Sequence, residues 1–435
     1  MTARSSNSRL IEIFRSNRDG ALVGAYSVCS AHSIVLRAAL ELARERRQIA
    51  VIEATCNQVN QYGGYTGMTP VRFANFVREM AADVGLPTED LVLGGDHLGP
   101  QPWRSLPAAE AMAHAIAMVQ AYAGAGFGKL HLDCSMACAD DPVTLTDKVI
   151  AERAAQLALA AEASAPDRAS LLYIVGTEVP APGGMGEGHM IHPTLATAVG
   201  ETWHAHRIAF DKSGLSEAFE RIVGVVVQPG LDFGNETIVH FTPEGAASLS
   251  ASVLTLGDAV FEAHSTDYQT PASYVSLIAQ HFAILKVGPA ATFAVREAIY
   301  ALDALARELP GWQSAFAVRA AMEAAMTRNP AHWASYYGGD SQQQAYLRHF
   351  SFSDRLRYYW TEPAVAQTVD RLFNFLDAAE VPLPLISQYF SQHWLAVTSG
   401  KLMPKAASLC IASVQTALTP YANACGDHAA MFSAQ

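Results

Sequence analysis

The chain has 435 residues, of which 50% are apolar, and a formal net charge of −12 at pH 7. This length allows one large core with an appended region. The acidic balance, with no lysine or arginine cluster, argues against a nucleic-acid partner. No apolar run reaches the roughly 18 residues of a membrane span, and the start of the chain does not resemble a signal peptide. The six scattered cysteines favour a reducing, cytoplasmic location.

The first part of the chain alternates short strand-like runs with helix-length segments. A short helix over residues 8–17 should cover the bottom of the fold. The strand-like runs are LVGAYSV, IAVIE, LVLGG, KLHL, LLYIVGT, IVGVVV, AVFEA and FAILKVG. Continuous Val, Ile and Leu runs separated by helices indicate buried parallel strands. About eight such units predict an α/β fold, a (β/α)8 TIM barrel, over residues 1–290.

The remaining residues, 291–435, are helical in pattern and contain no flexible linker at the junction. We therefore expect a C-terminal helical region that packs on the barrel. Its segment SFSDRLRYYW, residues 351–360, would cap the mouth of the barrel, form a contact between subunits of a homo-oligomer, or simply pack at the edge of the core.

The strand-like runs share one property, because most end in a side chain that can do chemistry. The carboxyl ends of barrel strands meet at one face, where barrel enzymes hold their active sites. These side chains should therefore converge on one pocket. They are Glu53, Asp96, His97, Asp133, Glu178, Gln228 and His264.

Clustered carboxylates raise one another's pKa unless a cation neutralises them, so a divalent metal or a shared proton is expected. His97 and His264, with the amide oxygen of Gln228, would suit Zn2+, Mn2+ or a similar ion. Such an ion polarises a ketose carbonyl while a carboxylate moves a proton. The candidates for that catalytic role are Asp96, Asp133 and Glu178.

Other residues near the strand ends are candidates for substrate binding. Lys286 would be a Schiff-base lysine, a phosphate contact or a paired structural charge, and the last two are favoured. The glycines of AGAGFGKL precede a strand instead of opening a helix, so this segment is not a phosphate-binding loop and kinase chemistry is disfavoured. The substrate-binding candidates are Glu53, Asn57, Ser265, Asp267, Lys286 and Gly288.

Longer motifs resemble one family over essentially the whole chain. IEATCNQVNQYGGYTGMTP, LGGDHLGPQPW, KLHLDCSMACADDP and FEAHSTDYQTP resemble the Z-type subunit of class II D-tagatose-1,6-bisphosphate aldolase. The resemblance implies a cytoplasmic TIM-barrel protein of galactitol or N-acetylgalactosamine catabolism. It also implies an accessory subunit that supports a separate catalytic aldolase subunit and is not catalytic alone.

A more distant similarity to catalytic class II aldolases assigns roles to single residues. By that similarity Asp96 is a proton donor and His97 and His264 are zinc ligands. Two positions depart from the pattern: Gln228 stands where the aldolases have a ligand histidine, and Ser265, Thr266 and Asp267 replace a glycine-rich phosphate loop. An acid there would repel a phosphate. Both departures fit lost or altered aldolase activity.

The retained carboxylates keep a second hypothesis open. Relatives in the broader group resemble metal-dependent ketose or uronate 4-epimerases, and an autonomous epimerase is the alternative to the accessory subunit. A true aldolase, or a sensor that binds a ketose or ketose phosphate without turnover, are further possibilities.

Overall fold

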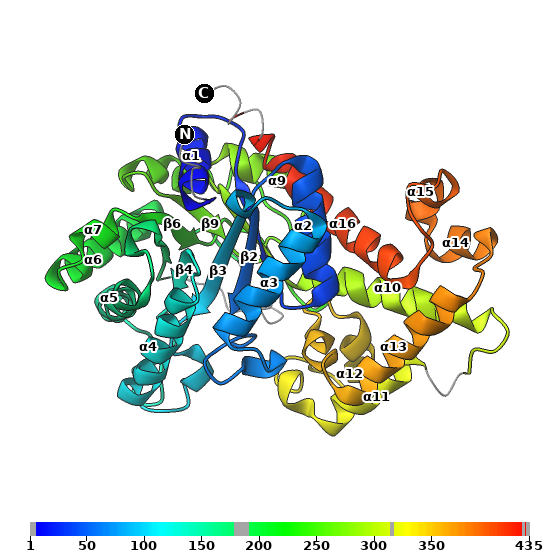
Figure 1. The fold of residues 1–435 in the computed structure, drawn as a ribbon. Coiled ribbons are helices and arrows are strands. Elements are labelled where there is room, and N and C mark those ends of the chain that lie inside the picture. Colours follow the sequence, from blue (N-terminus) through cyan, green and yellow to red (C-terminus); the bar gives the residue numbers. More distant parts are fainter. Residues whose placement is uncertain (1–5, 178–190, 314–316, 429–430, 432–435) are drawn as a thin grey trace.

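The computed structural model describes residues 6–177, 191–313, 317–428 and 431, and within them the chain forms the predicted barrel. Eight parallel strands close into a ring in the order β1-β10-β9-β6-β5-β4-β3-β2. Helices surround this ring (Figure 1). The barrel strands are β1 (Ala25–Cys29), β2 (Ala50–Thr55), β3 (Leu91–Leu98), β4 (Lys129–Leu132), β5 (Leu172–Val175), β6 (Ile222–Val227), β9 (Val260–Ala263) and β10 (Ile284–Val287).

Between β6 and β9 a short antiparallel hairpin interrupts the repeat. It pairs β7 (Asp232–Phe233) with β8 (Ile238–Val239). The helices are α1 (Ser6–Arg18), α2 (Ser33–Arg46), α3 (Pro70–Val84), α4 (Ala108–Gly124), α5 (Asp147–Ser164), α6 (Ala196–Lys212), α7 (Ser216–Phe219), α8 (Ala247–Ser252), α9 (Pro271–Ala279), α10 (Pro289–Arg307), α11 (Val318–Arg328), α12 (Ser341–Phe350), α13 (Pro363–Ala378), α14 (Leu383–Tyr389), α15 (Trp394–Thr398) and α16 (Ala406–Ala424). None of the described helices is both long enough and apolar enough to cross a bilayer.

Helix α1 closes the bottom of the barrel, as the sequence predicts. Leu10, Ile13 and Phe14 are buried in one cluster with apolar residues of the barrel strands, such as Ala25, Val51 and Val260. Asn17 donates two hydrogen bonds from Nδ2, to the carbonyl oxygens of Val23 (2.9 Å) and Ile278 (2.8 Å). The bottom of the barrel is therefore closed by the apolar packing of α1 and by the hydrogen bonds from Asn17 to two backbone carbonyl oxygens.

The C-terminal helices join the barrel through one continuous apolar core. Helix α16 packs against α2, α9 and α10. The hydroxyl of Tyr421 in α16 donates to the carbonyl oxygen of Thr266 (2.9 Å), and Gln48 donates to the carbonyl oxygen of Ala422 (2.8 Å). The end of the chain thus completes part of the helical layer around the strands.

Charged side chains occupy the interior of the barrel below its mouth. Lys129, at the start of β4, lies 2.6 Å from both Glu53 Oε1 and Glu262 Oε2. All three side chains have no exposed surface. Glu53 is two residues from the end of β2, not at its end as the strand-like run predicted. Gly94 of the neighbouring strand leaves room for it, since a Cβ atom there would lie 2.7 Å from Glu53 Cγ.

Loss of the apolar packing between α1 and the bottom of the barrel should destabilise the protein strongly. Phe14 is almost fully buried, so Phe14→Ala should lower the free energy of unfolding by about 3–5 kcal/mol, measured by urea denaturation. The matched control is Arg15→Ala, because the neighbouring Arg15 pairs with Asp258 at the surface and should cost little. Equal losses in both variants would contradict the sealing role of α1.

The buried charges should be interdependent. Lys129→Met leaves Glu53 and Glu262 short of one cation, and breaking a buried ion pair costs about 3–5 kcal/mol. The double variant with Glu262→Gln should recover part of that loss, as measured by the urea midpoint. Lys148→Met, at an exposed lysine, is the control. A double variant less stable than the single one would show that the charges do not compensate each other.

Candidate functional site

Three imidazole rings gather where the barrel opens. His97 belongs to β3, His131 to β4, and His264 follows β9 directly. Their ring centroids are 5.0 Å apart for His97 and His131, 4.9 Å for His97 and His264, and 5.2 Å for His131 and His264. All three rings are buried. His97 and His131 come from neighbouring strands, and closure of the barrel brings His264 to them.

Each ring is oriented by its own carboxylate. His97 Nδ1 is 2.7 Å from Asp133 Oδ2, and His131 Nδ1 is 3.0 Å from Asp96 Oδ1. His264 Nε2 is 2.9 Å from Glu262 Oε1. A carboxylate behind a histidine fixes the orientation of the ring and raises its basicity, and metal-ligating histidines carry such a partner.

The pKa values of these groups follow from burial and charge. Burial lowers the pKa of His264 to about 4, in spite of the opposing hydrogen bond to Glu262. For His97, burial acts to lower the pKa, but the charges of Asp96 and Asp133 outweigh it and raise it overall. Burial would raise the pKa of Asp133, and the hydrogen bond from His97 reverses that, so it stays below its usual range. His264 is therefore a neutral ring at pH 7.

Lys286 connects the interior charges to the mouth. Its ammonium contacts Glu53 and lies 2.8 Å from Asp96 Oδ1 and 3.5 Å from Glu262 Oε1. Burial alone would lower the pKa of Lys286, yet these acids, Asp96 most strongly, raise it well above its usual value. A lysine held protonated is unsuited to attack a carbonyl. This geometry supports a paired charge and not a Schiff base.

The residues present fit a divalent metal ion. Asp96, His131, Glu262 and His264 each place one ligand atom within 4.8 Å of the others. His131 Nε2 is buried without a hydrogen-bond partner among the described residues. Imidazole and carboxylate ligands in this combination suit Zn2+ or Mn2+, and a buried ring nitrogen without a partner is one that such an ion could satisfy.

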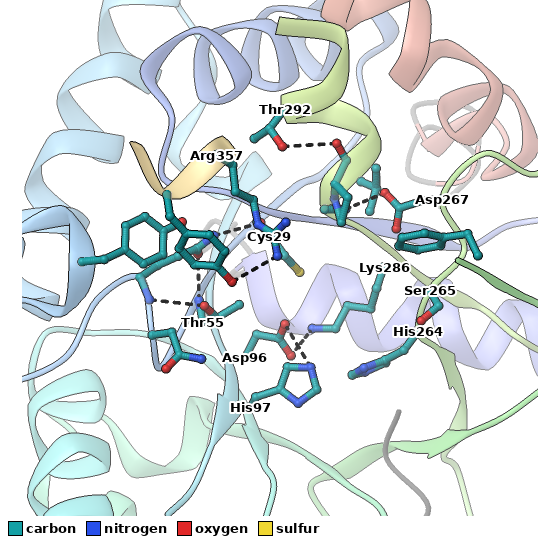
Figure 2. Close-up of a pocket in the computed structure, with 18 residues that line it drawn as sticks. Cys29, Thr55, Asp96, His97, His264, Ser265, Asp267, Lys286, Thr292 and Arg357 are labelled. Carbon is teal, nitrogen blue, oxygen red and sulfur yellow. Dashed lines mark hydrogen bonds and ion pairs between the residues drawn. The ribbon is translucent and has the colours of Figure 1, made fainter. Parts of the chain in front are cut away.

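A cavity opens above this cluster, with about 730 Å3 of empty space, some of it open to solvent. Figure 2 shows Asp96, His97 and His264 along one side of it and Arg357, Thr292 and Asp267 along the other. The cavity is lined by Cys29, Thr55, Asn57, Gln58, Tyr65, Asp96, His97, Phe233, His264, Ser265, Asp267, Lys286, Val287, Gly288, Pro289, Thr292, Arg357 and Tyr358.

The C-terminal region contributes a wall of this cavity. Arg357 and Tyr358 belong to the short helix η8 (Arg355–Tyr359). Phe352 lies just before η8. Its carbonyl oxygen accepts a hydrogen bond from the hydroxyl of Tyr268 (2.7 Å), and the backbone amide of Phe352 donates to the carbonyl oxygen of Asn235 (2.9 Å). These bonds fix η8 to loops that follow the barrel strands.

Two residues at the mouth have strained backbone conformations. His97 and Ser265 hold left-handed conformations with φ of 49° and 53°. Non-glycine residues rarely adopt this region, and they persist there where surrounding contacts impose it, often at functional sites. Both residues line the cavity. The strain therefore coincides with the site.

The candidates from the sequence fall into three groups. Asn57, Asp96, His97, His264, Ser265, Asp267, Lys286 and Gly288 line the cavity. Glu53 and Asp133 lie behind it, as partners of the lysines and of His97. Gln228 uses its amide oxygen to accept from the amides of Gly230 (2.8 Å) and Leu231 (3.1 Å). The third imidazole beside His97 and His264 is that of His131. Glu178 lies outside the described residues.

Several site residues were not predicted from the sequence. Lys129 and His131 precede Asp133 at spacings of two, and Glu262 precedes His264 in the same way. Alternate residues of a strand point to the same face, so this spacing was a usable signal for inward side chains. Arg357 and Tyr358 had a weaker signal, the aromatic and basic segment that was one candidate for a cap over the mouth.

Comparisons with known proteins agree with this architecture. The model of a family described as D-tagatose-1,6-bisphosphate aldolase subunit GatZ/KbaZ-like matches residues 10–426. A solved structure of a probable tagatose 6 phosphate kinase from Sinorhizobium meliloti 1021 is 47% identical, with a TM-score of 0.85, over 92% of this chain and 100% of that one.

Two aldolase structures are far more distant. A fructose-bisphosphate aldolase from Campylobacter jejuni is 12% identical (TM-score 0.45, 87% of this chain and 96% of that one). The YdjI aldolase from Escherichia coli K12 is 11% identical (TM-score 0.39, 85% and 98%). The match that spans nearly the whole barrel and the C-terminal helices decides the assignment: the chain belongs to the GatZ/KbaZ-like family of D-tagatose-1,6-bisphosphate aldolase subunits.

Proposed function

We propose that this chain is itself an enzyme, a divalent-metal-dependent ketose 4-epimerase that works at the mouth of its barrel. The observation that carries the proposal is a cluster of three carboxylate-oriented imidazoles beside Asp96 and Lys286. Of these groups, His97, His264, Asp96 and Lys286 line an open cavity. Buried charges cost desolvation energy and often add nothing to stability. A purely supportive subunit would have no use for this cluster, whereas a site for sugar chemistry requires it.

His131, His264 and Glu262 are the residues that would hold the ion, since each places a ligand atom within 4.8 Å of the others. When bound, a divalent ion polarises a ketose carbonyl and lowers the energy of the enediolate that forms when a neighbouring C–C bond breaks. Asp133 would act as a positioning residue, since it holds the His97 ring.

The protein's own groups would move the proton. Asp96 lines the cavity, and Lys286, 2.8 Å away, favours its carboxylate form. An ionised carboxylate at the cavity wall is able to accept the proton of the C4 hydroxyl.

The reaction balances without any other reactant. Asp96 takes the proton of the C4 hydroxyl, the C3–C4 bond breaks, and its electron pair passes to the C1–C3 fragment as an enediolate. The C4 aldehyde turns its other face to the enediolate, the bond re-forms, and the proton returns to the new C4 oxygen. The product is the C4 epimer of the substrate. The wall formed by η8 would keep both fragments in place until they recombine.

The second candidate function is the accessory role, which is favoured by the family's description as an aldolase subunit. In that case the chain would support a separate catalytic class II aldolase subunit in galactitol or N-acetylgalactosamine catabolism in the cytoplasm. The two functions differ in what the chain does alone.

The decisive test follows D-tagatose, its 6-phosphate and its 1,6-bisphosphate by NMR, with the purified chain and Mn2+ or Zn2+. Appearance of a C4 epimer is expected, and Asp96→Asn should reduce its rate by about 10²–10⁴-fold because the proton acceptor is lost. If no ketose is converted, and the chain only stimulates an added class II aldolase, the epimerase proposal fails and the accessory role stands.

Metal content gives an independent test. The purified chain should retain about one equivalent of divalent ion, and His131→Gln should lower the metal content by at least about tenfold. His206→Gln is the matched control, since His206 is also buried with an unpartnered Nε2 but lies in α6, away from the cavity. Elemental analysis after dialysis measures both. Equal metal content in the two variants would contradict the assigned ligand set.

A further inference from the structure

Two features at the rim of the cavity are suited to bind an anion. The first is the amino terminus of α10, whose amides already donate hydrogen bonds to Asp267. Barrels of this class often bind phosphate at the loops after the last two strands and a helix amino terminus there. Here the equivalent place is the start of α10. Asp267 Oδ1 accepts from the amides of Gly288 (3.0 Å) and Ala290 (2.8 Å), and the side chain is buried. Its carboxylate stands where a phosphate would be received.

The second feature is the guanidinium of Arg357. It has five N–H groups. Two bonds from Nη1 go to the carbonyl oxygens of Ser353 and Asp354, and one from Nη2 goes to the hydroxyl of Tyr358 (3.1 Å). Two N–H groups are therefore left without an acceptor among the described residues.

The charge of Arg357 is also available. No ion pair joins it to a carboxylate within the part of the chain that the structure describes, in contrast to Lys129 and Lys286. The side chain is half-buried, lines the cavity and lies across it from Asp96 and His97 (Figure 2). An arginine held by backbone carbonyls at the wall of a cavity, with two N–H groups left without an acceptor among the described residues, is suited to bind an oxyanion with two hydrogen bonds.

We propose that Arg357 is the specificity-determining residue of this pocket, which takes a ketose with a single anionic end, bound by Arg357, and not a ketose with two. This inference rests on the proposed function and adds the substrate class. The reacting carbons lie over Asp96 and the imidazoles, and the anionic end points to η8. The other end of the ketose lies toward Asp267, where a second phosphate would meet a carboxylate instead of free helix amides.

A phosphate and a carboxylate both satisfy this description, because each offers two oxygens to a guanidinium. A ketose monophosphate and a keto-uronate are the two sources of that chemistry. They differ in charge and size, so parallel titrations distinguish them.

The experiment is calorimetric titration of the full chain, loaded with Mn2+, with four probes: D-tagatose, D-tagatose 6-phosphate, D-tagaturonate and D-tagatose 1,6-bisphosphate. One of the two monoanions should bind at least about tenfold more tightly than free tagatose, and the bisphosphate no more tightly than the monophosphate. Arg357→Gln should weaken binding of the preferred monoanion by about 10–100-fold and that of free tagatose by less than about threefold.

Two further variants keep the test decisive. Arg357→Lys retains the charge without the paired donors and should lose part of the affinity. Arg328→Gln removes an exposed arginine of the same region and should change nothing. Thermal melts identify any variant that fails to fold, and if Arg357→Gln does so, the Arg357→Lys titrations decide.

The outcomes separate this inference from the proposed function. Equal loss of tagatose and monoanion binding in the Arg357 variants, or a bisphosphate that binds most tightly, would overturn the role of Arg357 even if C4 epimerisation occurs. Selective loss of monoanion binding without any C4 conversion would support that role and sink the epimerase proposal alone.

Discussion

The site depends on how positive and negative charges alternate inside the barrel. Lys129 lies between Glu53 and Glu262, and Lys286 joins the same acids to Asp96. Unpaired buried charges cost several kcal/mol each, so the favourable arrangement leaves these side chains little freedom. The network continues outward through Glu262 to His264 and through Asp96 to His131. The rings at the mouth are thus held by charges below it.

The charged side chains that support the site lie deeper in the barrel than those that can contact a ligand. Glu53 and Lys129 are fully enclosed and have no contact with the cavity, whereas Asp96, His97, His264 and Lys286 line it. A reactive group that is fixed by a second group needs little reorganisation when a ligand arrives. Depth in the barrel, more than residue type, therefore decides which carboxylate can meet a substrate.

The C-terminal region has two structural roles at different levels of the barrel. Helix α16 lies against α2 and α9 as part of the outer helical layer. The η8 segment instead reaches the mouth, where hydrogen bonds to Asn235 and Tyr268 hold it. An arginine more than 250 residues from Asp96 along the chain thereby faces the same cavity. The barrel alone would leave this side of the pocket open.

The sequence by itself determined the alternation of strands and helices, the helical C-terminal region, and the gathering of Asp96, His97, His264 and Lys286, because parallel strands bring their carboxyl ends to one face. Tertiary structure decided what each polar group is bonded to. It directs Glu53 to the lysines, Gln228 to its own loop and Asp267 to the start of α10, and it supplies His131 and Arg357. Hydrogen-bond partners distant along the chain leave no local pattern, so only the closed barrel with its C-terminal cover could assign them.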